Sequence, residues 1–360
     1  MSGSEQYKRT KNLNTLYEEL AFELDDGDQG HFLSGWQCEN PCVSDLLFAI
    51  KERSKHIDYR KYKYFDEDDE LSNRIRKIHN SFDGVSPQGI LCASGTTALL
   101  YSFVTYLKRI GISRIYYIPP IYFTLHIAFE LYGICATQVS AQQPFEKRFS
   151  MDLPNENGSV LFLTDPIWYT GTHYPADILE EIVEWQKRTS SLVFVDGSLQ
   201  YLPWNGAVNE NTARLDTSLT FRLVCPSKQL SVHGYRFSYL LLPYSHERSL
   251  AWTYANIAGP APADSIAFAH EAMAAISDRA VPDELMKIVS KRHIYLRTNN
   301  IIESDISPDC GYFVFEKIKT TLPEGYVMVD GKFFALCNYP GYTKINLLSP
   351  SLKVLGDIPD

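Results

Sequence analysis

The sequence predicts an α/β protein with two domains: a large one with a mostly parallel sheet flanked by helices, and a smaller α+β one. Apolar runs of strand length alternate with amphipathic helical patterns through the middle of the chain. Those runs are continuous rather than alternating, which is typical of strands buried on both faces. The length of 360 residues exceeds what a single hydrophobic core comfortably serves, so two cores are expected.

The large domain is placed at residues 56–255. Its predicted strands, in chain order, are residues 89–94, 114–120, 159–166, 191–198 and 237–243. Its predicted helices are residues 96–110 and 176–189. The second helix places Ile178, Ile182 and Trp185 on one face, which indicates that this face packs on the sheet.

The smaller domain is placed at residues 1–55 together with 256–360. Helices are predicted at 260–279 and 283–302, and strands at 310–318 and 332–339. Long helices followed by strands favour an α+β unit, completed by the N-terminal segment.

Composition excludes several classes of function. The net charge of -9 argues against a nucleic-acid-binding protein, and no apolar run reaches the roughly 20 residues that cross a membrane. The N-terminus has no signal-peptide pattern, and seven cysteines without a CxxC pair predict reduced thiols in a cytoplasmic protein. The nine histidines show no metal-ligand spacing, so no metal is expected.

The stretch CPSKQLSVHGYRF (225–237) places Lys228 and Arg236 eight positions apart. A partly desolvated lysine loses its proton more easily and can form a Schiff base with an aldehyde. An arginine binds a phosphate through two parallel hydrogen bonds. The alternative is that both are solvated surface charges.

Three further features follow predicted strands. Ser94 and Thr96, in ASGTTA, open a helix whose free amides suit an anion, although both are also ordinary helix caps. Asp196 ends a buried strand, where a carboxylate is costly unless it is paired, or else caps a turn. The Tyr122 ring could stack on a flat ligand or pack in the core.

One ligand uses all of these groups: pyridoxal 5'-phosphate, an aromatic aldehyde with a phosphate and a basic ring nitrogen. Over roughly residues 30–350 the sequence resembles the fold-type I pyridoxal-phosphate-dependent transferases, in particular the class I/II aminotransferases. The resemblance implies roles for a set of cofactor-binding residues, which are Ser94, Gly95 and Thr96 at the phosphate, Tyr122 on the ring, Asp196 and Ser198 near the ring, the CPSK residues Cys225, Ser227 and Lys228, and Arg236 at the phosphate.

The resemblance also implies the chemistry. Lys228 would hold the cofactor aldehyde, give it up to an L-amino acid as an external aldimine, and then remove the α-proton. Asp196 would keep the ring nitrogen protonated, so that the ring accepts the electrons of the Cα carbanion. Active sites of this family lie between two subunits, which implies a homodimer in which Tyr62 reaches the neighbouring phosphate.

Several positions depart from the family pattern. Trp168 and Leu199 stand where an asparagine and a tyrosine bind the cofactor's phenolic oxygen, with Ser198, Gln200 or Tyr201 as candidate replacements. Cys225 replaces a serine, and Glu67 replaces a glycine near Tyr62. In YTKINLL, Lys344 takes the place of an arginine that binds the substrate carboxylate; its alternative is an exposed strand cation. Trp168 is expected to contact the substrate as well, or else to pack in the core.

These departures leave three hypotheses open. The simplest is an amino-acid aminotransferase. The second is a pyridoxal-phosphate enzyme that carries out elimination, replacement, cyclisation (as a dehydratase or cyclase) or decarboxylation of a specialised amino acid. The third is a non-catalytic, ligand-sensing module of the same fold; retention of Lys228 and an N-terminal segment too short for a DNA-binding domain argue against it.

Overall fold

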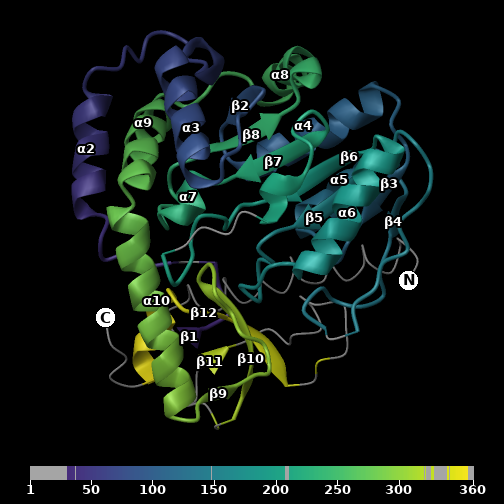
Figure 1. Ribbon diagram of the computed structural model, residues 1–360. Coiled ribbons are helices and arrows are strands. Elements are labelled where there is room, and N and C mark those ends of the chain that lie inside the picture. The colour runs from purple at the N-terminus through teal and green to yellow at the C-terminus, as the bar shows by residue number, and fades with distance from the viewer. Residues whose placement is uncertain are drawn as a thin grey trace.

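A seven-stranded sheet forms the centre of the molecule (Figure 1). The computed structural model describes residues 31–36, 38–146, 148–206, 211–319, 321, 326–327, 339 and 341–355. In spatial order the strands are β2 (Gly89–Ala93), β8 (Ser238–Leu242), β7 (Thr220–Val224), β6 (Leu192–Asp196), β5 (Val160–Thr164), β3 (Ile115–Tyr117) and β4 (Ala136–Gln138). Only β8 runs antiparallel to its neighbours, so the predicted mostly parallel sheet is confirmed.

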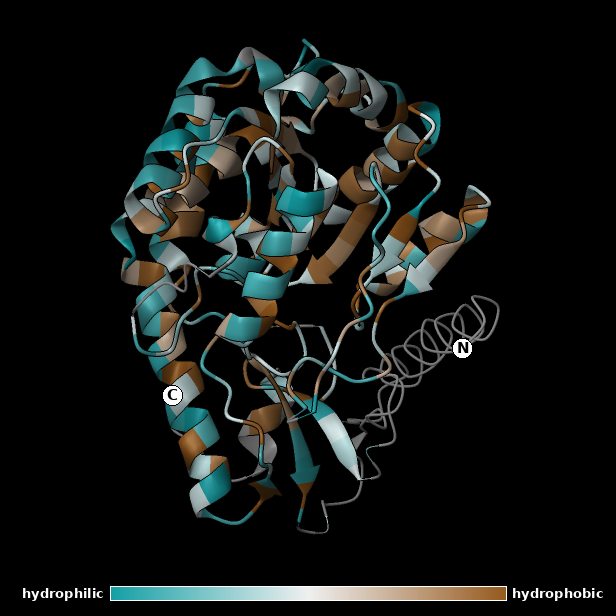
Figure 2. Cartoon of the chain, turned by 45° about the vertical axis from the view of Figure 1, so that its right-hand side comes forward, coloured by the Kyte–Doolittle hydropathy of each residue, from teal (hydrophilic) through white to brown (hydrophobic). Residues whose placement is uncertain are grey.

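Helices cover both faces of this sheet. Helices α4 (Thr96–Arg109), α5 (Phe123–Leu131) and α8 (Tyr244–Ala258) share one apolar cluster with one face. Helices α3 (Asp69–Phe82), α6 (Ala176–Thr189), α9 (Ala263–Asp278) and α10 (Ala280–Thr298) contribute to the clusters on the other face, with α2 (Ser44–Ser54) outside α9. In Figure 2 a central strand of this sheet is brown, and the helices around it carry teal residues, as this layering requires.

Strand β7 does not appear among the predicted strands because its sequence, TFRLV, places Arg222 in the middle of an apolar run. The guanidinium is buried, and the carboxylate of Asp83, at the end of α3, balances its charge 3.4 Å from Nη1. The same Nη1 donates a hydrogen bond to the side-chain oxygen of Gln200, also at 3.4 Å. A buried arginine is tolerated when such partners are present, so the strand forms although its composition argues against it.

A polar cluster surrounds this arginine. His79 Nε2 lies 2.9 Å from the Tyr239 hydroxyl, and the Tyr201 hydroxyl donates to Asp83 while lying 3.1 Å from His79 Nδ1. Burial lowers the pKa of His79, because desolvation outweighs the nearby Asp83. Tyr201 has a positive φ of 69°, which a tyrosine adopts only when its surroundings hold it there. The cluster therefore fixes the segment that follows β6.

The second part of the structure contains a three-stranded sheet of β9 (Ile302–Glu303), β10 (Phe313–Ile318) and β12 (Tyr342–Asn346), with β10 central and its neighbours antiparallel. A separate parallel pair joins β1 (His31–Phe32) to β11 (Tyr326–Val327). The predicted strand at 332–339 lies almost entirely outside the described residues. Apolar residues of β6 and β10 share one cluster, and the boundary between residues 255 and 256 stays a prediction.

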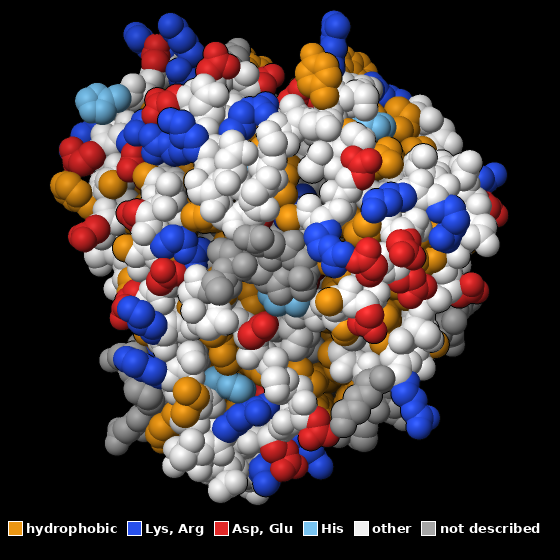
Figure 3. All heavy atoms as spheres, viewed as in Figure 1, with side chains coloured by type: hydrophobic (Ala, Val, Ile, Leu, Met, Phe, Trp, Pro, Cys, Tyr) orange, Lys and Arg blue, Asp and Glu red, His pale blue; other side chains and the backbone are white. Residues whose placement is uncertain are grey.

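Three general features bear on the classes of function considered. No helix in the described part of the chain has the length and apolarity needed to span a bilayer. Among the same residues, His, Cys, Asp and Glu side chains do not gather into a group of three that could hold a metal ion. On the face seen in Figure 3, acidic and basic side chains are intermixed rather than separated into patches.

Candidate active site

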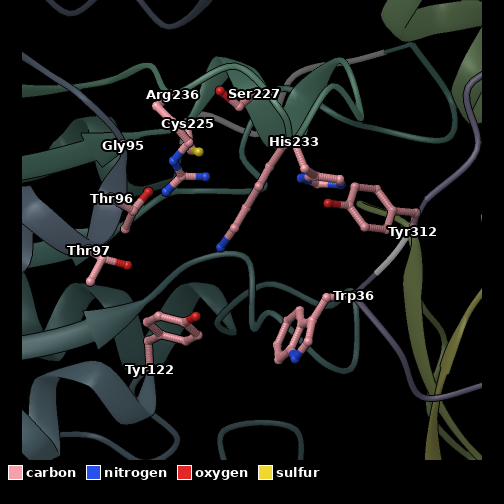
Figure 4. A pocket seen from close by; sticks show the side chains of 11 residues that line it. Trp36, Gly95, Thr96, Thr97, Tyr122, Cys225, Ser227, His233, Arg236 and Tyr312 are labelled. Atoms are coloured by element: carbon pink, nitrogen blue, oxygen red, sulfur yellow. The ribbon is translucent and has the colours of Figure 1, made fainter. Parts of the chain in front are cut away.

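A cavity of about 230 Å³ opens where the carboxyl ends of β2, β3 and β7 meet. Ligands of open α/β sheets bind at such strand ends. The lining residues are Trp36, Gly95, Thr96, Thr97, Tyr122, Cys225, Ser227, Lys228, His233, Arg236 and Tyr312 (Figure 4). A smaller space beside it also touches Tyr122 and Lys228, and is lined in addition by Asp196, Ser198, Trp168, Leu199 and Phe313. The structure thus brings the predicted motifs to one place.

One end of the cavity is built to receive an anion. Helix α4 begins at Thr96 without a side-chain cap, so its first amides point at this end. Thr96 lines the cavity, and the buried hydroxyl oxygens of Thr96 and of the nearby Ser94 have no hydrogen-bond partner among the described residues. Ser94 does not line the cavity itself, and its contact with a phosphate stays a prediction. Leaving such a group unsatisfied costs about 1–3 kcal/mol, which a bound acceptor would offset. The arrangement therefore suits the three acceptor oxygens of a phosphate.

Arg236 completes this anion end and explains the glycine beside it. Gly95 has a φ of +91°, and a Cβ at this position would lie 2.5 Å from Arg236 Nη2. Such an approach is closer than van der Waals contact, and the φ value also disfavours a side chain. Arg236 forms no ion pair with any described residue, which leaves its fork of donors available.

Lys228 enters the cavity from the short helix α7 (Pro226–Gln229), which directly follows β7. Its Nζ lies 5.1 Å from the centre of the Tyr122 ring. Burial lowers the pKa of the amine, but Cys225, Tyr122 and Asp196 together outweigh it, so the net pKa lies above the usual lysine value. Of the residues that face it, Asp196 is the carboxylate that can supply a negative charge at neutral pH.

Asp196 ends β6 and is buried. Its Oδ1 accepts hydrogen bonds from the backbone N–H (3.0 Å) and the hydroxyl (2.6 Å) of Ser198, which fixes the carboxylate. Its Oδ2 accepts from no other described residue, so one oxygen remains for a ligand in the smaller space. Ser198 therefore acts in the structure as the support of Asp196.

The two other residues of the CPSK motif shape the turn. Cys225 is the buried residue that precedes α7, and its sulfur faces the cavity. The Ser227 hydroxyl lies 2.9 and 3.1 Å from the carbonyl oxygens of Tyr235 and Phe237, and the Phe237 N–H donates back to it at 3.3 Å. This serine ties the Lys228 turn to the start of β8; its direct contact with a cofactor stays a prediction.

An aromatic wall stands beside the Lys228 amine. Trp36 stacks on Trp168 with ring centroids 5.4 Å apart, and the edge of Trp36 meets Tyr122 and Phe313 at 6.3 and 5.6 Å. The Trp168 position is fixed by a short hairpin in which His173 Nδ1 lies 2.9 Å from Asp165 Oδ1. Burial opposes a charge on this histidine, but the carboxylate raises its pKa to about 11, so the pair is ionic at neutral pH.

Lys344, in β12, lies behind this wall and is fully buried. Its Nζ sits 3.5 Å from the centre of the Trp36 ring, 4.4 Å from that of Phe313 and 5.5 Å from that of Trp168. Burial lowers the pKa of the amine well below its usual value, in spite of the nearby Cys38. Lys344 does not line either space described above, and its contact with a substrate stays a prediction.

Three other candidates lie away from the cavity. Tyr62 is 79 % exposed on the segment after α2, where a partner subunit could use it. Gln200 and Tyr201, considered as replacements for Leu199, instead join the polar cluster around Arg222. Of the proposed replacements, Ser198 alone lines the smaller space.

Seven lining residues carried no signal that was used in the sequence: Trp36, Thr97, Thr164, Pro166, His233, Tyr312 and Phe313. Thr97 follows Thr96 in the first turn of α4, so the reasoning that predicted an anion site at the start of this helix also applies to it. Trp36, Tyr312 and Phe313 come from distant segments that only the fold brings together. His233 stands inside the 225–237 stretch, but an isolated histidine gives no signal of its role.

The residues present fit pyridoxal phosphate. The unsatisfied hydroxyls of Ser94 and Thr96 with Arg236 match the phosphate, the Asp196 oxygen matches a protonated ring nitrogen, and the Lys228 amine lies above the Tyr122 ring. Tyr122 and Lys228 line both spaces, so they lie between the anion end of the cavity and the Asp196 carboxylate.

Comparison with known proteins agrees with this fit. The family model described as aminotransferase class I and II matches residues 33–350. N-succinyldiaminopimelate aminotransferase from Mycobacterium tuberculosis has a TM-score of 0.75 at 15% identity, covering 97% of each chain. BacF from Bacillus subtilis scores 0.77 at 16% identity, covering 93% of this chain and 92% of that one. An aspartate aminotransferase double mutant from Thermus thermophilus scores 0.75 at 17% identity over 96% of each chain.

No curated protein sequence matches the chain, and at these low identities the solved structures show the fold alone. The family model covers most of the chain, so the chain belongs to the class I and II aminotransferases. The predicted resemblance, the fold-type I transferase fold and the aminotransferase-like enzyme class are thereby confirmed.

Proposed function

We propose that this member of the class I and II aminotransferases moves the amino group of an L-amino acid onto pyridoxal phosphate held at Lys228. The observation that carries the proposal is the Lys228 amine, 5.1 Å from the centre of the Tyr122 ring, between an anion site at Thr96 and the fixed carboxylate of Asp196. A surface lysine would have no reason to lie in such a cavity.

Bound pyridoxal phosphate supplies an aldehyde and a ring that accepts electrons from the reacting carbon. Ser94, Thr96, the first amides of α4 and Arg236 would hold the phosphate, and Tyr122 would pack on the ring. Asp196 Oδ2 holds a proton on the ring nitrogen, since Oδ1 is already used by Ser198. Lys228 Nζ would be the amine that holds the aldehyde, and the same nitrogen would serve as the base that accepts and returns the α-proton of the substrate.

A second candidate is elimination, replacement, cyclisation or decarboxylation of a specialised amino acid. The observation that favours it is Leu199, which lines the smaller space with hydrocarbon where the family has a tyrosine hydroxyl, next to Trp168 in place of an asparagine. Loss of such hydrogen bonds changes the proton affinity of the groups around the reacting carbon.

Product balance separates the two candidates. The cofactor-loaded protein is incubated with single L-amino acids, with and without a 2-oxo acid, and products are counted by mass spectrometry. Without an added 2-oxo acid, an aminotransferase is expected to form at most one 2-oxo acid product per active site, and the cofactor is recovered as its amine. With an added 2-oxo acid, it is expected to turn over repeatedly. Repeated turnover without any 2-oxo acid contradicts transamination and favours the second candidate. A protein that changes no amino acid under either condition contradicts both.

We also propose a cytoplasmic homodimer with active sites at the subunit interface. Free thiols at all six described cysteines support a reducing compartment, and the exposed rings of Tyr59, Tyr62 and Tyr64 support an interface. Sedimentation of the loaded protein at micromolar concentration is expected to give twice the chain mass of 41.1 kDa. A monomer that still binds the cofactor tightly would remove Tyr62 from the site.

A further inference from the structure

His233 stands across the cavity from the anion site. In Figure 4, Thr96, Thr97 and Arg236 form one side, while His233, Tyr312 and Trp36 form the opposite side. His233 lies on the turn between α7 and β8, which also carries Lys228, so both side chains enter the cavity from one backbone segment. A ligand that reached from the phosphate end past the Lys228 amine would meet this second side.

The His233 ring has an unused hydrogen-bonding atom in this place. Its Nε2 is buried, and no residue in the described part of the chain forms a hydrogen bond with it. An orphaned buried polar atom of this kind costs about 1–3 kcal/mol, so a bound group that pairs with it is favoured. The ring nitrogen is therefore placed to bind a ligand atom rather than to support the fold.

Charges around His233 explain what kind of atom fits. Burial, together with the positive charges of Lys228 and Arg236, lowers the pKa of the histidine to about 4, so the ring is neutral in the free protein. Tyr312, the titratable group facing it from the segment before β10, is a neutral phenol whose pKa burial raises well above its usual value. A negatively charged ligand group would offset the positive charges of Lys228 and Arg236. It would therefore raise the pKa of His233 and favour the protonated ring.

The Lys344 amine is less well placed than His233 to bind a negatively charged ligand group. It is fully buried against the rings of Trp36 and Phe313 and does not line the cavity, whereas His233 does. A carboxylate would have to displace Trp36 to reach Lys344, but it can meet His233 inside the existing cavity.

We propose that His233 binds the carboxylate of the amino-acid substrate through Nε2. This inference rests on the proposed function, since it takes the substrate to be held at Lys228. His233 is on this basis a specificity-determining residue, which makes the protein prefer a free carboxylate over its neutral amide.

The test compares a carboxylate probe with a neutral copy of the same shape, 3-phenylpropanoate and 3-phenylpropanamide. Binding of each to the cofactor-loaded protein is measured by calorimetry at pH 6, 7 and 8. In the unaltered protein, the carboxylate is expected to bind more tightly than the amide, with the preference increasing as the pH falls. His233→Phe is expected to reduce this preference about tenfold to a hundredfold, as for the loss of one hydrogen bond to a charged group.

Three further variants sharpen the result. His233→Gln keeps a hydrogen-bond donor without a titrating ring, so it is expected to retain part of the preference and to lose its dependence on pH. His56→Phe, a change at an exposed histidine away from the cavity, is expected to keep both. An unchanged preference in folded His233→Phe overturns the inference, as does a preference that disappears in Lys344→Met and persists in His233→Phe.

Failure of the proposed function is recognised separately. Borohydride treatment before calorimetry shows whether the cofactor is attached to residue 228. Absence of that attachment contradicts the proposed function, and the inference falls with it. Attachment at residue 228 together with an unchanged carboxylate preference in His233→Phe contradicts the inference alone.

Discussion

Replacing Lys228 by alanine is expected to abolish the attachment of the cofactor and to lower turnover by at least about four orders of magnitude. The reason is that one amine would both hold the aldehyde and move the α-proton. General base catalysis alone contributes a rate enhancement of about 10²–10⁴-fold, and loss of the covalent attachment lowers the rate further. Cofactor should still bind without a covalent bond, since the anion site and Tyr122 are untouched. Borohydride reduction followed by peptide mass analysis gives the attachment, and single-turnover kinetics give the rate.

Lys287→Ala provides the matched control, because this lysine is exposed and its ion-pair partner among the described residues is Glu284, at 3.1 Å on the surface. It is expected to retain both the attachment at residue 228 and the rate. Added methylamine should restore part of the activity of Lys228→Ala by supplying the missing base. A cofactor fixed to another lysine, or turnover near that of the unaltered protein in Lys228→Ala, would disprove the assignment.

Asp196→Asn is expected to lower turnover by about three to four orders of magnitude, which corresponds to about 4–5.5 kcal/mol of transition-state stabilisation. The asparagine keeps an oxygen for the two Ser198 hydrogen bonds, so the local turn survives. It puts an amide NH₂ where Oδ2 now offers a charge, and a neutral donor cannot hold a proton on the ring nitrogen. The measurements are kcat and the fraction of protein that retains cofactor, which should stay high.

The chain contains a close copy of this turn for comparison. Asp216 Oδ1 accepts from the backbone N–H (2.8 Å) and the hydroxyl (2.7 Å) of Ser218, on an exposed segment outside the cavity. Asp216→Asn therefore makes the same chemical change in the same turn and is expected to leave turnover unaltered. Equal losses in the two variants would mean that the effect comes from the turn, and similar turnover in Asp196→Asn and the unaltered protein would remove Asp196 from the proposed role.

Sequence alone predicted the parts of the site that lie at strand ends. Asp196, Tyr122 and the Ser94–Thr96 turn each directly follow a buried apolar run, and the topology of a parallel sheet brings such positions together. The large-domain strands were predictable for the same reason, since continuous apolar runs leave few alternatives. Local pattern and a general rule of topology were sufficient for these residues.

The remainder depends on tertiary contacts that no local pattern reports. Strand β7 contains a buried Arg222 whose partners are supplied by α3 and by the segment after β6. Helix α5 is apolar around most of its circumference, so it shows no amphipathic period. Lys344 was placed as an exposed or substrate-facing cation, but the rings of Trp36, Phe313 and Trp168 enclose it, and these rings come from three distant segments.

The buried group of Arg222, Asp83, His79, Tyr201 and Tyr239 has a consequence for how such a protein can diversify. Replacement of Arg222 or Asp83 would leave the other charge unpaired in the interior, so this group of residues tolerates little variation. The aromatic wall of the cavity is formed by Trp36, the Asp165–His173 hairpin and Tyr312. Replacing these residues does not remove any member of the buried polar cluster. In related proteins, changes in substrate range should therefore arise through substitutions in that wall, while the buried polar cluster stays the same.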